Sequence, residues 1–307
     1  MPTIEALSLN FAGAALTQVS DAELTLFADL IYVRTGIRIS PQKKTLLSNR
    51  LRRRLRDTGI AGFGAYYEHL KQLPRHSPEW DAFLQEITTH ETYLFRDEAQ
   101  WEWFRNDYLA ERTALVRQGI ARPALRIWSA ACSTGDEPIT AACCIAACLP
   151  NYAQWRIQIL GTDIGQGALE QARTAVFGER AMRLVPADYR VRFFLKAKDA
   201  NVWQARPALT SLVAYRCHNL LEPLGDGPFD VVFLKNVLIY FDGASKRRVL
   251  EHVRGALRPG GLLMAGAAEG VGELVRDFAR LQPWLFRKPE NPPRSAPRPC
   301  PHTGSPS

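Results

Sequence analysis

The sequence predicts an α/β fold, in which a mostly parallel, Rossmann-like sheet with helices on both faces follows a small all-helical N-terminal domain. Three observations predict this fold. Residues 125–138 have the pattern of a strand, a tight turn and the start of a helix. Four strand–helix units occur in sequence, which requires a parallel sheet with right-handed crossovers. Residues 20–72, by contrast, have the apolar spacing of helices.

Length and composition indicate a globular protein of two domains. The chain has 307 residues, of which 46% are hydrophobic and 23% charged, so it can bury a sizeable core. No apolar run approaches the roughly 20 residues that span a bilayer. Residues 1–18 have no basic stretch before their apolar residues, so we expect no secretory signal, no membrane insertion and a cytoplasmic location. The formal charge of +8 indicates an acidic or polyanionic partner.

The six cysteines do not form an obvious metal-binding pattern. Cys143, Cys144 and Cys148 lie on one predicted helix, where Cys144 and Cys148 share a face. This spacing leaves a metal site open as an alternative. Buried thiols in a reducing compartment are the commoner outcome, and we expect no metal.

The N-terminal domain is predicted to span residues 1–78 and to contain a basic helix at about 41–57. Asp21 is expected to cap a first helix whose apolar positions include Tyr32. The basic helix has one stripe of leucines at four-residue spacing and, with no acid from 43 to 56, seven basic residues: Lys43, Lys44, Arg50, Arg52, Arg53, Arg54 and Arg56. Arg52, Arg53 and Arg56 are expected to point away from the leucines. They form either a solvated face or a docking surface for an acidic partner.

Residues 73–78 form a break that we interpret as a domain boundary. The next segment, 87–97, is interpreted as a packed amphipathic connector, in which Thr92 and Arg96 would share a face if the segment were helical. The residues expected to face the core from the helix that follows are Trp101, Trp103, Phe104, Tyr108 and Leu109. The α/β domain is predicted to span residues 79–288, and the Pro-rich residues 289–307 are predicted to be disordered.

The strand–turn–helix at 125–138 opens the α/β domain. Its turn contains Gly135, and Pro138 falls in the first helical turn, where its missing N–H is tolerated. Small residues there would let a ligand approach the backbone, and an ordinary strand–helix turn is the alternative. Further strands are expected at 156–163, 211–217, 229–236 and 262–267. Asp163 ends the second strand, where Rossmann-type folds bind ribose hydroxyls.

Several stretches resemble the CheR family, the S-adenosylmethionine-dependent methyltransferases that esterify glutamates of bacterial chemoreceptors. They are THETYLFR (89–96), IWSAACSTGDEP (127–138), GTDI (161–164), NLL (219–221), FDVVFLKNVLIYFD (229–242) and PGG (259–261) followed by AE (268–269). Residues 36–56 and 66–67 also resemble the family's helical domain. The resemblance covers roughly residues 20–288. It implies a class I methyltransferase sheet and an S-adenosylmethionine-dependent protein-glutamate O-methyltransferase, with S-adenosylhomocysteine as the product.

The resemblance also implies a set of site residues. The cofactor-binding positions would be His90, Thr92, Arg96, Glu137, Asp163, Asn219, Leu220, Asn236 and Val237. Asp163 would take the ribose hydroxyls, and Asn219 and Leu220 would lie along the adenine. Arg96 and Tyr240 would be catalytic: Arg96 orients a carboxylate of either the substrate or the cofactor, and Tyr240 faces the methyl group. Arg52, Arg53 and Arg56 would meet the cytoplasmic helices of methyl-accepting receptors. The implied enzyme is a monomer that binds no nucleic acid.

The sequence departs mildly from the family pattern. His90 replaces an Asn that is common in the family, and Lys235 stands where an Arg is usual. The expected small β-subdomain, at about 176–212, matches the family poorly, which leaves binding of a receptor's tether peptide open. Three other functions are considered: a scaffold that binds cofactor or receptor without turnover, a nicotinamide-dependent oxidoreductase, and a methyltransferase acting on another substrate such as nucleic acid. A turn with one glycine disfavours the oxidoreductase.

Overall fold

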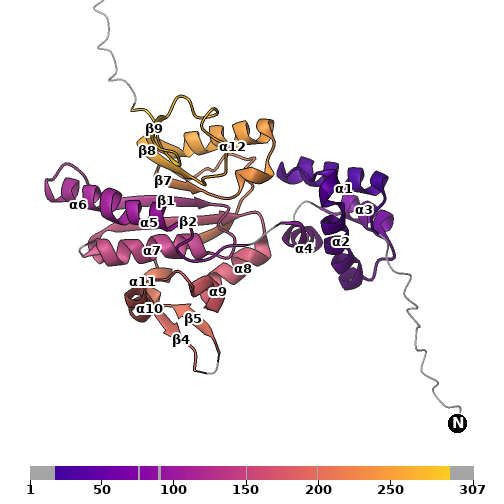
Figure 1. Cartoon of the computed structure of the whole chain (residues 1–307), viewed down its shortest axis with the longest axis horizontal. Coiled ribbons are helices and arrows are strands. Elements are labelled where there is room, and N and C mark those ends of the chain that lie inside the picture. The colour runs from indigo at the N-terminus through magenta and orange to yellow at the C-terminus, as the bar shows by residue number, and fades with distance from the viewer. Residues whose placement is uncertain (1–17, 75–76, 89–90, 150, 199, 291–307) are drawn as a thin grey trace, which may run out of the picture. The chain divides into compact units, whose positions relative to one another are not determined.

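The computed structural model describes residues 18–74, 77–88, 91–149, 151–198 and 200–290. The chain folds into two compact units (Figure 1). The first is helical and contains the described residues up to 88 together with 165–167, and the second contains the remainder from residue 91. No helix within the described ranges has the length and apolar character needed to cross a membrane.

The helical unit is built from α1 (Asp21–Thr35), η1 (Pro41–Lys43), α2 (Lys44–Thr58), α3 (Phe63–Gln72) and α4 (Pro78–Ile87). In α4, Trp80 donates its indole N–H to the carbonyl of Leu70 at 2.9 Å, and Phe83 packs against Phe27 and Tyr66. These contacts make α4 part of the helical core. The predicted boundary at residue 78 therefore lies inside this unit.

The start of α1 differs from the prediction. Ser20, and not Asp21, is the N-cap: its hydroxyl accepts the N–H of Glu23, whose carboxylate accepts the N–H of Ser20 in return. This reciprocal arrangement satisfies two backbone N–H groups, whereas a single N-cap side chain satisfies one. Tyr32 is exposed, whereas the other predicted apolar positions of α1 are buried.

The basic helix α2 buries its leucine stripe as predicted, through Leu47, Leu51 and Leu55. Its cations are not uncompensated, however, because acids arrive from neighbouring helices. Lys44 pairs with Asp21 of α1. Arg53 and Arg54 pair with acids of α4, Glu86 and Glu79 respectively. Counting charges along one helix could not find these acidic partners, because they come close to α2 only through tertiary packing.

The second unit contains a seven-stranded sheet in the order β6-β2-β1-β7-β8-β10-β9. Its strands are β1 (Ala124–Ala130), β2 (Arg156–Asp163), β6 (Val213–Cys217), β7 (Phe229–Leu234), β8 (Leu257–Ala265), β9 (Ala279–Gln282) and β10 (Leu285–Arg287). The first five strands in the sheet order are parallel, and β10 and β9 add an antiparallel hairpin. The prediction of a mostly parallel, Rossmann-like sheet is confirmed.

One strand begins earlier than predicted. Between the pairs Phe229↔Leu257 and Val231↔Leu262 the register shifts, so residues 258–261 bulge out of β8. The predicted Pro-Gly-Gly turn is therefore a bulge within a strand. The hairpin of β9 and β10 was not predicted, because the short β9 is fully exposed and has no apolar alternation.

Helices cover both faces of the sheet. They are α5 (Glu98–Trp103), the π-helical η2 (Phe104–Tyr108), α6 (Leu109–Arg117), α7 (Asp136–Cys148), η3 (Tyr152–Gln154), α8 (Gln166–Thr174), η4 (Leu238–Tyr240) and α12 (Gly243–Ala256). Residues Leu125 and Ile127 of β1 pack with α5, η2 and α7 on one face. Trp128 and Ala130 pack with α12 on the other. This alternation is the period of a strand buried on both sides.

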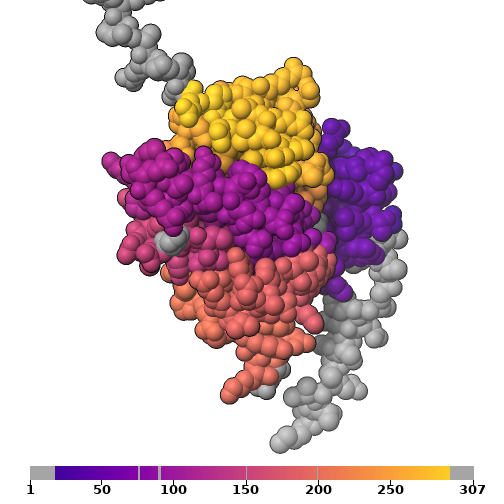
Figure 2. Space-filling model, turned by 60° about the vertical axis from the view of Figure 1, so that its left-hand side comes forward, coloured from indigo at the N-terminus to yellow at the C-terminus, as the bar shows by residue number. Residues whose placement is uncertain are grey.

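A small three-stranded antiparallel sheet lies in the range expected for the β-subdomain, residues 176–212. It contains β3 (Val176–Gly178), α9 (Glu179–Met182), α10 (Ala187–Phe193), β4 (Phe194–Lys196), β5 (Val202–Ala205) and α11 (Pro207–Thr210), with strand order β3-β5-β4. In the space-filling view this subdomain, in salmon, protrudes below the purple band that carries α5 and α6 (Figure 2). Its apolar side chains join the same core as α7.

Candidate cofactor and catalytic site

Polar side chains gather where β1, β2 and β7 end, at the carboxyl edge of the parallel sheet. The chain leaves β1 through a turn in which Ala131, Ser133 and Gly135 all have positive φ. Ser133 donates its backbone N–H to the carboxylate of Asp163 at the tip of β2, at 2.8 Å. Asp163 is only 7% exposed. The turn after β1 and the acid after β2 therefore form one polar group, at the edge where ligands bind in open α/β sheets.

Gly135 is required by packing as well as by its backbone conformation. A Cβ at this position would lie 2.6 Å from the hydroxyl of Tyr215. Gly161 of β2 has the same neighbour, because its Cβ would lie 2.8 Å from the Tyr215 ring. Two glycines from different segments thus make room for one tyrosine of β6. Gly135 therefore makes room for a side chain of the protein itself. The sequence pattern alone did not distinguish this role from close approach of a ligand.

The chain after β6 turns back over the same edge. His218 donates its backbone N–H to the Asp163 carbonyl at 2.9 Å, and its ring packs edge-on against Trp128. Asn219 accepts the N–H of Leu221 through its side-chain oxygen, and Leu220 is buried. Asn219 and Leu220 therefore follow directly after the residue that bonds to Asp163. The side chain of Asn219 itself stabilises the turn in which they lie.

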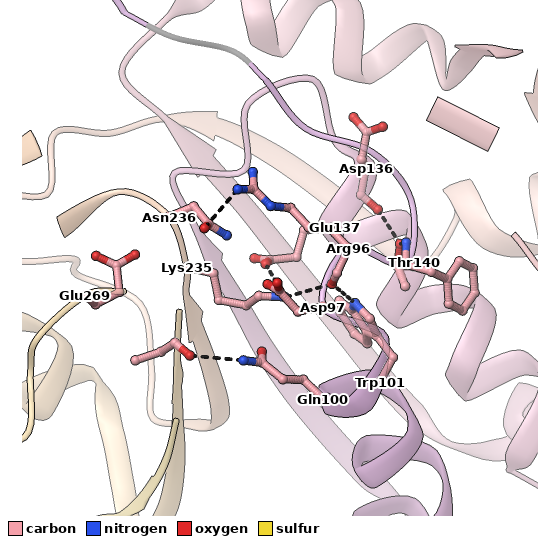
Figure 3. A network of polar contacts seen from close by, with 12 residues as sticks. Arg96, Asp97, Gln100, Trp101, Asp136, Glu137, Thr140, Lys235, Asn236 and Glu269 are labelled. Atoms are coloured by element: carbon pink, nitrogen blue, oxygen red, sulfur yellow. Dashed lines mark hydrogen bonds and ion pairs between the residues drawn. The ribbon is translucent and has the colours of Figure 1, made fainter. Parts of the chain in front are cut away.

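Glu137 and Lys235 form a buried ion pair at the centre of the site (Figure 3). Glu137, on α7, accepts the hydroxyl of Ser129 at 2.7 Å. The ammonium of Lys235 lies 3.7 Å from Glu137 and 3.1 Å from Asp97, with its side chain 3% exposed. Burial raises the pKa of Glu137, and the nearby charge of Lys235 opposes that rise.

Arg96 lies in an irregular segment and not in a helix. Phe95 and Asp97, on either side of it, have φ values of 60° and 64°. The proposed helical face shared by Thr92 and Arg96 therefore does not exist. The guanidinium of Arg96 donates to the carbonyl of Glu91 and to the side-chain oxygen of Asn236, both at 2.9 Å. Two sequence-predicted residues separated by 140 positions are thus in direct contact.

The backbone carbonyl of Arg96 is held as well. It accepts the indole N–H of Trp101 at 2.8 Å and the ammonium of Lys235 at 3.2 Å. Both donors are visible in the close-up of the network (Figure 3). The position of Arg96 is therefore fixed at its backbone by α5 and by the end of β7, and at its guanidinium by Asn236.

The loop after β7 is held by a buried glutamate. Asn236 has φ 60°, and the next N–H, that of Val237, donates to the carboxylate of Glu269 at 2.9 Å. Glu269 has no exposed surface, and burial raises its pKa. Tyr240 follows in η4, partly exposed. Glu269 thus organises the loop that carries three of the predicted site residues.

The structure brings together most, but not all, of the predicted residues. Arg96, Glu137, Asp163 and the 236–240 loop lie in one unit at one sheet edge, with Thr92 half-buried at the start of the Arg96 segment. His90 lies outside the described residues. Arg52, Arg53 and Arg56 belong to the helical unit, where with Asn49 they line a surface hollow of about 350 Å³.

Sequence reasoning gave no role to Lys235, Asp97, Ser129 or Glu269. One signal could have found Lys235: a lysine directly after an apolar strand that is buried on both faces needs an acidic partner. Among the described residues, no group of three or more His, Cys, Asp or Glu side chains is arranged to hold a metal ion. Cys143 and Cys144 are free, buried thiols.

Comparison with known proteins identifies the family. Residues 22–88 match the CheR methyltransferase all-alpha domain, and residues 90–284 match the CheR methyltransferase SAM binding domain. A chemotaxis protein methyltransferase of Salmonella typhimurium is 35% identical over 265 residues, which cover 85% of this chain and 88% of that protein. The Escherichia coli chemotaxis protein methyltransferase is 33% identical over 264 residues, covering 85% and 88%. Chemotaxis protein methyltransferase 2 of Pseudomonas aeruginosa is 37% identical over 257 residues, covering 81% and 88%. The chain belongs to the CheR methyltransferase family and is an S-adenosylmethionine-dependent methyltransferase.

Proposed function

We propose that this enzyme transfers a methyl group from S-adenosylmethionine to glutamate side chains of methyl-accepting receptors, giving glutamyl methyl esters. The observation that carries the proposal is the guanidinium of Arg96, held against Asn236 at the carboxyl edge of the sheet. A fixed guanidinium suits the orientation of a carboxylate through two parallel hydrogen bonds. The names of the relatives, chemotaxis protein methyltransferases, support the same class of substrate.

The polar groups at the sheet edge fit the chemistry of the cofactor. Its ribose has two hydroxyl donors, and Asp163 offers a nearly buried carboxylate in the position that Rossmann-type folds use for them. Asn219 and Leu220 would lie along the adenine. The methionine part has an ammonium, which the carboxylate of Glu137 matches in charge. Thr92, Asn236 and Val237, with His90, would line the same end.

The reaction requires positioning more than acid–base chemistry. When bound, the cofactor supplies a methyl group already activated on a sulfonium. A glutamate carboxylate, with a pKa of about 4.3, is already ionised at neutral pH. The residues of this chain would therefore orient the carboxylate and exclude water from it. Arg96 is suited to orientation, and Tyr240, on the adjoining loop, would form a wall beside the methyl group or donate a hydrogen bond.

The basic face of α2 is the proposed receptor-docking surface. Arg53 is 58% exposed even with its partner Glu86 in place, and Arg56 is exposed. With Arg52 they line a hollow in which acidic side chains of a receptor helix would find three cations. We infer that the enzyme acts as a cytoplasmic monomer on the cytoplasmic helices of such receptors, and not on nucleic acid.

A transfer assay tests the proposed function. The full-length chain is incubated with radiolabelled S-adenosylmethionine and receptor cytoplasmic fragments from the same organism. We expect label that is released by mild alkali, as a carboxyl ester is, and mass spectrometry should locate it on glutamates. Changing those glutamates to alanine in the fragment should abolish labelling, and Arg96→Ala in the enzyme should reduce it. Donor binding without transfer would indicate the scaffold alternative, and label in DNA or RNA would overturn the protein substrate.

A further inference from the structure

The backbone of the segment that carries Arg96 adopts a conformation that needs contacts from the surrounding structure. Phe95 and Asp97 both lie in the left-handed region, at φ 60° and 64°, which is unfavourable for a bulky residue such as phenylalanine and is tolerated better by aspartate. Such conformations persist where the surroundings impose them. Part of the surroundings is already described, since Lys235, Trp101 and Asn236 hold Arg96 from the sheet side. Thr140 of α7 also accepts the backbone N–H of Phe95 at 3.0 Å, and further contacts come from the β-subdomain.

The β-subdomain reaches this segment through α9 and the residue after it. Leu94 donates its backbone N–H to the carbonyl of Ala181 at 3.1 Å. The guanidinium of Arg183 lies 3.5 Å from the centroid of the Tyr93 ring. Arg180 also pairs with Glu91, but both side chains are largely exposed, 71% and 59%, so this pair contributes little. The backbone bond is the main attachment, and the Arg183 contact, although Arg183 is exposed, adds the cation–π attraction of an exposed site, about 0.5–1 kcal/mol.

Tyr93 connects the subdomain directly to the candidate catalytic arginine. The guanidinium of Arg96 lies 5.7 Å from the centroid of the same ring that Arg183 contacts. One aromatic ring is therefore shared by two guanidinium groups, one structural and one in the site. Cations within about 6 Å of an aromatic ring are attracted to it. Phe95 adds a further contact, packing edge-on against Tyr189 of α10.

We propose that Arg183 and Tyr93 are positioning residues for Arg96, so that the β-subdomain completes the methyl-transfer site in addition to any role in docking. The proposal rests on the proposed catalytic role of Arg96. If Arg183 is removed, Tyr93 loses the guanidinium that lies 3.5 Å from the centroid of its ring, and the segment from 91 to 97 should sample other conformations. Turnover should then fall, because the guanidinium is in place for only part of the time.

The test compares Arg183→Ala with Arg183→Lys and with a matched control in the same subdomain. Lys196→Ala is the control, because Lys196 lies 5.3 Å from the Trp203 ring and does not touch the segment. Hydrogen exchange of the peptide covering 91–97 is measured without receptor, and kcat and KM are measured with it. We expect faster exchange and a kcat about two- to fivefold lower in Arg183→Ala, corresponding to a cation–π contact of about 0.5–1 kcal/mol. Arg183→Lys should restore most of the exchange protection and most of kcat. KM for the receptor should stay constant in all variants. Lys196→Ala should change neither the exchange rate nor kcat.

A double substitution separates this route from general destabilisation. Tyr93→Leu removes the shared ring, and adding Arg183→Ala to it should lower kcat no further, because the two residues act through one contact. Additive losses, unchanged exchange at 91–97, or a kcat equal to that of the control would overturn the proposal. If the wild-type enzyme methylates no receptor, the proposed function fails, and the exchange measurement still decides whether Arg183 orders the segment.

Discussion

Replacing Lys235 with methionine should destabilise the methyltransferase unit by removing the cation between two acids. Its ammonium lies 3.7 Å from Glu137 and 3.1 Å from Asp97. Unit charges at the longer distance interact by about 4–5 kcal/mol at an effective dielectric constant of about 20. The side chain of Asp97 is 35% exposed and that of Glu137 only 16%, so the loss of Lys235 should leave Glu137 as the less solvated of the two acids. Because breaking a buried pair usually costs about 3–5 kcal/mol, we expect a loss of about 3 kcal/mol.

The loss should depend on pH in a defined direction. Burial already raises the pKa of Glu137, and Lys235 opposes this rise, so Lys235→Met should raise the pKa further. A carboxyl whose pKa is higher in the folded than in the unfolded state binds more protons when folded. Its contribution to stability is therefore present at low pH and lost as pH rises through the folded pKa. The variant should be less stable relative to wild type at pH 8 than at pH 5.5.

Urea unfolding followed by tryptophan fluorescence and circular dichroism measures both effects. Lys235→Met/Glu137→Gln should recover most of the lost stability, since the amide can still accept the Ser129 hydroxyl. Arg276→Met is the control in the same unit, because its ion pair with Glu273 is exposed on both sides, and it should change stability by less than about 1 kcal/mol. A loss below about 1 kcal/mol in Lys235→Met, or a loss equal at the two pH values, would refute the assignment of Lys235 as the counter-ion of Glu137.

The other site residues give four further expectations. Asp163→Ala should weaken S-adenosylmethionine binding more than tenfold by calorimetry, and an unchanged affinity would refute the ribose assignment. Arg96→Ala should lower kcat by about a hundredfold, and a fully active variant would remove Arg96 from the site. Glu269→Gln keeps one acceptor for the Val237 N–H, so it should retain most activity, whereas Glu269→Ala should lose about tenfold; equal effects of the two changes would contradict its role in holding the loop. Charge reversal at Arg53 and Arg56 should raise KM for an acidic receptor fragment without changing donor affinity, and an unmoved KM would mean that this face is only solvated.

Much of the sheet could be predicted because its signals are local. The predicted bounds of the second strand match β2 (Arg156–Asp163), and the alternation of β1 between two buried faces follows from its apolar pattern. Asp163 could be proposed because it ends a strand at an edge where such folds place acids.

The remainder depends on contacts between distant segments. Nothing local indicates that Phe95 adopts a positive φ, because a bulky side chain disfavours it. The pairing of Lys235 with Glu137 joins the residue after β7 to the first turn of α7, and the bond from Leu94 to Ala181 joins the site to an insertion. The sequence pattern identifies residue types suited to a site, but the contacts between them are known only from the folded structure.

The fit of Tyr215 between Gly135 and Gly161 limits how this enzyme can diverge. The space that one aromatic ring occupies exists only because two other positions have no side chain. During evolution the tyrosine could become smaller first, at the expense of a cavity, and a methyl group at Gly161 would then no longer meet its ring. Gly135 would stay fixed, because its φ is 86° and a Cβ there would also lie 2.9 Å from the Cβ of Ala172. Among related enzymes Gly161 should therefore change only where residue 215 is smaller, whereas Gly135 should not change.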